Sequence, residues 1–445
     1  MTHQAGLEDR IATGRRQVAQ AGPLAADLGG TLLIYAPVPL YQEDGKFHVE
    51  AQACNGLRLW AENFARLIVM MPVSANRPKG AWVPVDRLGD SLAKIQIEAV
   101  PTAYRPQEFQ RALPAMRRRI RALIDQADYM SFSIGGLFGD WGTVASLEAH
   151  RMGRPFAVWT DRVESEVVRR TADHGPFKAR LRARLYHRPM AWLERFVIRR
   201  SALGLFHGKE TYDAYAPFSS NPHIVHDVHY SKSDHIGASA LAAKIAGCSQ
   251  GPIRICYAGR ADPMKAPLEW IEVIEKLAAS RIEFQAIWLG DGDLFPQLKS
   301  RIEAAGLADR VSAPGYVSDR SRVIETIRDS HVFLFCHKTP ESPRCLLEAL
   351  ISACPIVGYE SAFATDLVAS NGGGLFAPNG DTAALARHLV ALGRDRRKLA
   401  DLIGKAARDG TPFDDVSVFR HRSELIKHHL SAKACGTRFE HATQV

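Results

Sequence analysis

The sequence predicts an α/β protein made of two doubly wound, Rossmann-like domains in tandem. Short apolar runs typical of buried parallel strands alternate with amphipathic helical segments along most of the chain. The alternation stops in a polar stretch and then starts again, and 445 residues are more than one hydrophobic core usually holds. Ligands bind beyond the carboxyl ends of such strands, so we expect two domains that face a common cleft.

The first domain is expected over residues 30–235, after a flexible lead-in at residues 1–29. A Pro-rich loop is expected at 37–45, and a long basic helix before the last strand. The strands are expected at 31–36, 67–71, 129–133, 155–159 and 203–206, with helices at about 49–66 and 142–152.

The second domain is expected over residues 250–412, because the polar segment 219–250 is typical of a domain boundary. A helix is expected at 268–279, another around 322–328 and a third from Pro343. The strands are expected at 253–258, 284–289, 311–313, 332–336 and 356–359.

The charge of the chain favours anionic partners. Lys and Arg number 57 and Asp and Glu 48, which gives a net charge of +9. No recognisable readout motif accompanies the basic residues, so we do not expect nucleic-acid binding. Seven cysteines without metal-binding spacing, the lack of a secretory signal and the lack of a membrane-length apolar run indicate a cytoplasmic protein that at most contacts a membrane surface.

The segment 340–350 is the most informative motif. Ser342 is a good N-cap and Pro343 suits the first helical position, so a helix is expected to begin here. The backbone N–H groups of Arg344 and Cys345 at that helix start favour a phosphate.

Two glutamates bracket the same helix start. Glu341 and Glu348 lie nearly two turns apart and therefore on one side of the helix. They could accept hydrogen bonds from sugar and ribose hydroxyls while the amides hold a diphosphate. Alternatively, Glu341 complements the helix dipole and Glu348 pairs with Arg344.

Three further strand ends carry candidate donor-binding residues. Gly259, Arg260 and Lys265 follow one strand and suit a diphosphate, although an ordinary polar loop would read the same way. Gly290 and Gly292 follow the next strand but lack the third glycine of a dinucleotide fingerprint.

The third of these strand ends carries Tyr316, which could meet a base or simply pack. No dedicated metal site is evident in the sequence, and cationic side chains can replace an ion here, so neither a metal site nor a cofactor is expected.

The serial order of these elements, from Ile253 to about Asp381, resembles the retaining glycosyltransferases of family 4, which have the two-domain GT-B fold. The resemblance implies that Arg260 and Lys265 clamp the donor diphosphate. It further implies that Glu341 touches the transferred sugar, so that these three residues form the catalytic set, and that Glu348 binds the ribose.

The resemblance has one departure in the acidic motif, because six residues separate the glutamates where the family has seven. The family register, counted back from Glu348, falls on Pro340. The resemblance also implies that residues 413–431 form a helix that crosses back to the first domain, followed by a tail at 432–445.

The implied function is transfer of a hexosyl unit, with retained configuration and without a metal, from a UDP- or GDP-sugar. The acceptor would be a glycan or lipid-linked saccharide in polysaccharide or glycoconjugate biosynthesis. One alternative is a sugar-nucleotide epimerase on the same fold. Another is a noncatalytic partner subunit that binds the nucleotide sugar, which the shortened motif also allows.

The first domain resembles the family only in layout. It lacks the usual glycine pair after the first strand and the usual His after a middle strand. Asp140, Trp141 and Asp161 follow strands and are expected on the acceptor side, with Asp161 orienting the acceptor. Cap or surface roles are the alternative for each.

The basic segment before the last strand of the first domain has an apolar side. Such a helix could dock on anionic lipid at the inner face of the cytoplasmic membrane. Alternatively, its apolar residues belong to the core and its arginines are solvated. The segment contains Lys178, Arg180, Arg182, Arg184, Arg188, Trp192 and Phe196.

Overall fold

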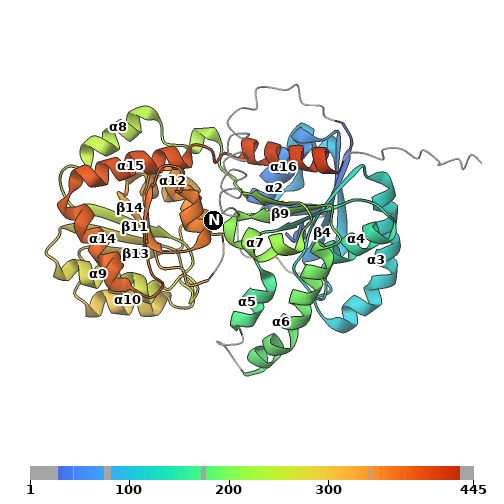
Figure 1. Cartoon of the computed structure of the whole chain (residues 1–445), viewed down its shortest axis with the longest axis horizontal. Helices are drawn as coiled ribbons and strands as arrows, with labels where there is room; N and C mark the ends of the chain where they lie inside the picture. Colours follow the sequence, from blue (N-terminus) through green and yellow to red (C-terminus); the bar gives the residue numbers. More distant parts are fainter. Residues whose placement is uncertain (1–28, 44, 75–81, 172–176, 340–341, 431–445) are drawn as a thin grey trace, which may run out of the picture.

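The computed structural model describes residues 29–43, 45–74, 82–171, 177–339 and 342–430. Two α/β domains lie side by side, each with a central sheet covered by helices (Figure 1). This is the predicted fold class. The predicted lead-in at 1–29 and tail at 432–445 fall almost entirely outside the described residues.

The sheet of the first domain has ten strands, and its main part is parallel. The parallel order is β10-β9-β8-β7-β1-β4-β6, so the strand order reverses between β1 and β7. The strands are β1 Thr31–Tyr35, β2 Leu40–Glu43, β3 Lys46–Glu50, β4 Arg66–Ser74, β5 Trp82–Pro84, β6 Ile95–Pro101, β7 Tyr129–Ser133, β8 Ala157–Thr160, β9 Leu203–His207 and β10 Pro222–Val225.

The prediction of a loop at 37–45 holds for residues 37–39 and is wrong from Leu40 on, where β2 begins. Strand β2 pairs in parallel with the end of β4 and antiparallel with β3, while β3 pairs antiparallel with β5. The Pro-rich sequence is compatible with such a short strand, because proline is tolerated at strand starts and sheet edges.

The helices of the first domain cover both faces of its sheet. Helices α5 and α6 project away from the sheet as a pair (Figure 1). The helices are α2 Ala51–Asn63, α3 Pro106–Gln126, α4 Trp141–Arg151, α5 Glu164–Thr171, α6 Phe177–Ile198 and α7 Gly208–Tyr215, with 3-10 turns at Val85–Lys94 and Ala216–Phe218.

The sheet of the second domain has six strands, all parallel, in the order β13-β12-β11-β14-β15-β16. The strand order reverses between β11 and β14, which is where ligands of doubly wound sheets bind. The strands are β11 Ile253–Ala258, β12 Phe284–Leu289, β13 Val311–Gly315, β14 Val332–Phe335, β15 Ile356–Tyr359 and β16 Gly374–Ala377.

The helices of the second domain lie on both faces of that sheet, with α12 and α15 on one side and α9, α10 and α14 on the other (Figure 1). A short 3-10 turn at Lys232–Asp234 precedes them. The helices are α8 Ala238–Gly247, α9 Pro267–Ala279, α10 Phe295–Ala304, α11 Arg320–Asp329, α12 Arg344–Ile351, α13 Ala362–Leu367, α14 Thr382–Arg394 and α15 Arg396–Gly410.

Two segments run between the domains. The stretch expected as a boundary contains α8, which belongs to the second domain: it packs on α15, and the Lys244 ammonium donates to the Ser352 carbonyl over 3.1 Å. The last helix, α16 Asp415–His429, returns to the first domain and packs on α2. Phe419 and Ile426 of α16 belong to the first domain's core.

Candidate functional site

The loops that follow β11, β12 and β13, at the carboxyl edge of the second sheet, are joined by backbone hydrogen bonds. The amide of Gly259 donates to the Leu289 carbonyl over 2.8 Å, and the amide of Gly290 donates to the Gly315 carbonyl over 2.9 Å. The ends of β11, β12 and β13 are therefore locked to one another beside the point where the strand order reverses.

Two glycines permit this close packing. Gly290 has φ +143°, and a Cβ there would lie 1.9 Å from the Gly259 carbonyl oxygen. A Cβ on Gly292 would lie 2.7 Å from the Ala261 carbonyl oxygen. Both positions therefore need glycine for the close packing of these loops.

The cations predicted for the diphosphate lie on the loop after β11. Arg260 is exposed, and its Nη2 is 3.6 Å from Oδ2 of Asp262. The Asp262 carboxylate also accepts the amide of Lys265 over 3.1 Å, which shapes the loop. The Lys338 amide donates to the Met264 carbonyl over 2.9 Å, so this loop is joined to the one that follows β14.

His337, which the sequence did not single out, lies on the loop that follows β14. Its Nε2 is 2.9 Å from the Tyr257 hydroxyl, and the side chain is buried. Burial and the nearby Lys265 charge hold the pKa of His337 well below its usual range, so the ring is neutral. Its position directly after an apolar strand was the signal that could have identified it.

Helix α12 begins differently from the prediction. It starts at Arg344, Pro343 occupies the N-cap position, and no side chain caps the helix start. Ser342 is not the N-cap, because its hydroxyl donates instead to the His207 carbonyl of the first domain over 2.7 Å. Glu341 and Pro340 lie outside the described residues.

Glu348 sits in a partly buried position one turn into α12. The Tyr230 hydroxyl, from the segment between the domains, donates to its carboxylate. Burial raises the pKa of Glu348 to about 7. The predicted alternative of a pair with Arg344 is not what the structure shows, since Arg344 Nη1 donates to Gln52 Oε1 over 3.0 Å.

Arg344 also takes part in a charged cluster between the domains. Its Nη1 lies 3.9 Å from Asp227 Oδ2, and Arg422 Nη1 lies 3.7 Å from Asp227 Oδ1. Burial alone would raise the pKa of Asp227, but His229 and the two arginines hold it below the usual range. The start of α12, the segment after β10 and α16 are therefore joined electrostatically.

The domains touch closely at the end of β9. Gly208 has φ +73°, and a Cβ there would lie 2.4 Å from Phe363 and 2.5 Å from the Ser342 hydroxyl. The His207 and Phe363 rings lie 5.8 Å apart. The first domain thus reaches the same loop of the second domain that leads into α12.

Two of the three predicted acceptor residues have structural roles instead. Asp140 is the N-cap of α4 and accepts four hydrogen bonds, from the amides of Gly135, Gly136 and Thr143 and from the Thr143 hydroxyl, over 2.6–3.0 Å. Trp141 is fully buried and donates to the Pro101 carbonyl over 2.8 Å. The acceptor-side prediction is not supported for these two residues: Asp140 has the alternative role of a helix cap, and Trp141 is part of the core.

Asp161 is placed differently. It is exposed just beyond the carboxyl end of β8, and its charge acts on both His207 and Glu164. Burial raises the pKa of Glu164, whose carboxylate accepts Arg162 Nε over 2.7 Å. These acids lie on the side of the first domain that meets the second.

The remaining site prediction concerns Tyr316, which is 71% exposed directly after β13. Cys345 is partly buried in the first turn of α12.

Within the described parts of the chain, no group of three or more His, Cys, Asp or Glu side chains is placed to hold a metal ion. None of the described helices is long and apolar enough to cross a membrane.

Comparison with known proteins gives matches in sequence and in structure. Residues 242–409 match the family described as glycosyl transferases group 1. The chain is 27% identical over 183 residues to the amylovoran biosynthesis glycosyltransferase AmsK of Erwinia amylovora, covering 40% of this chain and 45% of that protein. It is 27% identical over 245 residues to the 2-deoxystreptamine N-acetyl-D-glucosaminyltransferase of Streptomyces fradiae, covering 51% and 57%. The chain thus spans about half the length of these relatives.

Solved structures match over most of the chain. The structure of Anabaena HepE in complex with UDP aligns with a TM-score of 0.61 at 15% identity, covering 88% of this chain and 97% of that one. A glycosyltransferase from Rickettsia africae aligns with a TM-score of 0.60 at 13% identity, covering 90% and 98%. The chain therefore has the GT-B fold, and residues 242–409 of its second domain are similar to the glycosyl transferases group 1 family.

Proposed function

We propose that this protein is a retaining glycosyltransferase that moves a hexosyl unit from a nucleotide diphosphate sugar to a glycan or lipid-linked saccharide. The observation that carries the proposal is the placement of Arg260, Lys265 and the uncapped start of α12 in the segments that follow β11 and β14, the two strands between which the strand order reverses. A relative named for amylovoran biosynthesis and a neighbour solved with UDP support the polysaccharide context and the nucleotide donor.

The first role of the site residues is to stabilise the leaving group. The leaving group is a nucleoside diphosphate, so the main demand is to stabilise the charge that develops on its oxygens as the sugar departs. Arg260, Lys265 and the first-turn amides of α12, at Arg344 and Cys345, supply that stabilisation. No metal is then needed, because side-chain cations take its place.

The sugar and the nucleoside are held by the remaining candidates. Glu341 contacts the transferred sugar, Glu348 accepts hydrogen bonds from the ribose, and Tyr316 lies beside the base. The acceptor hydroxyl gives its proton to the donor phosphate as the new glycosidic bond forms. Asp161 orients that acceptor.

The proposed reaction takes place in the cytoplasm, at the inner face of the membrane when the acceptor is lipid-linked. The charged residues of α6 support this placement, because a cationic helix is attracted to anionic headgroups by about 1 kcal/mol per near-surface charge.

The donor proposal is tested by protection against thermal unfolding. The full chain is screened with UDP- and GDP-sugars, since a ligand at 100 times its Kd stabilises the folded state by about 2.7 kcal/mol. We expect protection in the wild type and little or none in Arg260→Ala and Glu348→Ala. Lys299→Ala, which removes an exposed cation on α10, is the matched control and should be protected like the wild type.

The outcomes separate the proposal from its rivals. Unchanged protection in both site variants would reject the donor site. Isomerised sugar without an acceptor would indicate an epimerase. Donor binding with the donor left intact in every acceptor mixture would indicate a noncatalytic subunit.

A further inference from the structure

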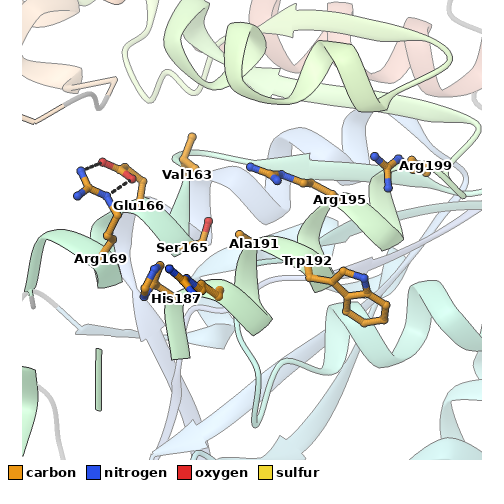
Figure 2. Close-up of a pocket in the computed structure, with 10 residues that line it drawn as sticks. Val163, Ser165, Glu166, Arg169, His187, Ala191, Trp192, Arg195 and Arg199 are labelled. Carbon is orange, nitrogen blue, oxygen red and sulfur yellow. Dashed lines mark hydrogen bonds and ion pairs between the residues drawn. The ribbon is translucent and has the colours of Figure 1, made fainter. Parts of the chain in front are cut away.

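The paired helices α5 and α6 enclose a pocket that the donor site does not use. Its volume is about 480 Å³, and four arginines line it: Arg169, Arg188, Arg195 and Arg199. Figure 2 shows Arg169 beside Glu166 on α5, and Arg195 and Arg199 at the opposite end of the pocket.

The pocket carries an excess of positive charge. Arg169 is paired with Glu166 over 2.6 Å, which is the acid among the lining residues. Within the described chain, Arg188, Arg195 and Arg199 form no ion pair, and all three are exposed. The guanidinium carbons of Arg195 and Arg199 lie 4.9 and 5.0 Å from the centroid of the Phe218 ring, so both make cation–π contacts with it, and their N–H groups can still donate to an anion.

An apolar stripe continues from the same pocket along α6. Phe177, Leu181 and Leu185 are 71%, 50% and 62% exposed, and Trp192, which lines the pocket, is 62% exposed. At about 100° per residue, these four side chains and the three unpaired arginines fall within a sector of about 80°. One helix face is therefore apolar at its outer end and cationic at its inner end.

The pocket is anchored to the acceptor side of the fold. Val163, at one wall, lies in the loop that follows β8, two residues after Asp161. Ser165 donates to the buried Glu194 carboxylate from its amide over 2.9 Å and from its hydroxyl over 2.6 Å, which fixes α5 against α6. The cations are thus held at a fixed place beside the interdomain region.

We propose that this pocket binds the phosphate or diphosphate group of a lipid-linked saccharide acceptor, while the exposed apolar end of α6 enters the bilayer. The order of apolar tip, arginine pocket and Asp161 matches the order of hydrocarbon, phosphate and sugar in such an amphiphile. Charge complementarity selects an anionic headgroup, and the apolar stripe selects a lipid over a soluble phosphate. The acceptor assignment rests on the proposed glycosyl transfer, whereas binding of the lipid does not.

The test is cosedimentation of the full chain with vesicles. Neutral phosphatidylcholine vesicles are compared with vesicles that also hold a long-chain polyprenyl diphosphate, or phosphatidylglycerol at equal surface charge. The triple variant Arg188→Gln, Arg195→Gln, Arg199→Gln removes the three positive charges of the pocket that form no ion pair. The control triple Arg180→Gln, Arg182→Gln, Arg184→Gln removes the same charge from the same helix, and none of its residues lines the pocket.

We expect the wild type to prefer the polyprenyl diphosphate vesicles and inorganic pyrophosphate to compete. The pocket triple should raise the Kd for those vesicles by about tenfold or more, the size expected from losing charge-assisted hydrogen bonds. The control triple should raise the Kd for the two kinds of anionic vesicle by similar factors, and by less than the pocket triple raises the Kd for the polyprenyl diphosphate vesicles. Leu181→Ser with Leu185→Ser should lose vesicle binding yet retain pyrophosphate binding in calorimetry.

Equal losses in the two triples, or no preference over phosphatidylglycerol, would overturn the proposal in favour of general surface attraction. Thermal protection by the donor is measured on the same variants and should be unchanged. Loss of donor protection in the wild type would reject the glycosyltransferase while leaving a lipid preference intact. Donor protection without any lipid preference would reject this site alone.

Discussion

The carboxyl edges of the two sheets are built in different ways. In the second domain, the loops that follow β11, β12 and β13 are joined by backbone hydrogen bonds, and the candidate donor residues lie on these loops or on α12. In the first domain, Asp140 and Trp141 hold the fold together, and the unpaired arginines of the pocket lie on α6 and directly after its end. We therefore expect a nucleotide to bind at a compact site and an acceptor to contact a more extended surface.

Lys265 should give the largest effect. Lys265→Ala is expected to lower kcat for transfer by about 10²- to 10³-fold, because one preorganised group that stabilises the leaving diphosphate is lost. The rate of nucleoside diphosphate release in the presence of acceptor measures this kcat. Lys299→Ala should be as active as the wild type, and a wild-type rate in Lys265→Ala would remove this residue from the catalytic set.

A substitution at Gly208 tests the close contact between the first domain and Phe363 of the second domain. Gly208→Ala should lower the free energy of unfolding by about 1–3 kcal/mol from overpacking, beyond the cost of the left-handed backbone. Gly153→Ala is the matched control, because Gly153 has φ +66° and a Cβ there would meet nothing within 4 Å. Urea unfolding of both variants measures the difference, and equal losses would contradict the close approach of Phe363 to Gly208.

Glu348 predicts a pH dependence of donor binding. Its pKa is raised to about 7 by burial, and ribose hydroxyls would donate to the carboxylate, so binding favours the deprotonated form. Donor affinity should therefore rise with pH and level off above 7, with Kd about tenfold higher at pH 6 than at pH 8. Calorimetry of Glu348→Gln should show a flat profile over that range, and a wild type with a flat profile would separate Glu348 from the ribose.

The two acids of the first domain should give the smallest and most distinct effects. Asp140→Ala should lower stability by about 1–2 kcal/mol through loss of the cap, with an unchanged acceptor KM. Asp161→Ala should raise the acceptor KM while stability changes by no more than about 0.5 kcal/mol, as is usual for exposed sites. The reverse pattern would restore Asp140 to the acceptor side.

The fold could be predicted because parallel strands that are buried on both faces leave continuous apolar runs. The run at 129–133 is β7, and those at 253–258 and 284–289 are β11 and β12. The hairpin of β2 and β3 was missed because short edge strands bury few side chains and carry weak patterns. Helix α8 was missed because its Ala-rich sequence resembles a linker.

The candidate site was predictable only where local sequence decides the geometry. The loop from Gly259 to Lys265 follows its strand directly, so its place at the sheet edge needed no tertiary knowledge. Ser342 was misassigned because its partner, the His207 carbonyl, is 135 residues away in the other domain. The same long-range character hid the contact of Tyr230 with Glu348 and the pocket between α5 and α6.

The most direct test of the account is a crystal structure of the full chain with UDP. We expect a diphosphate within hydrogen-bond distance of the Lys265 ammonium and of the first-turn amides of α12, with the ribose at Glu348. A diphosphate bound on the first domain, or a second-domain edge that stays closed to the nucleotide, would contradict it.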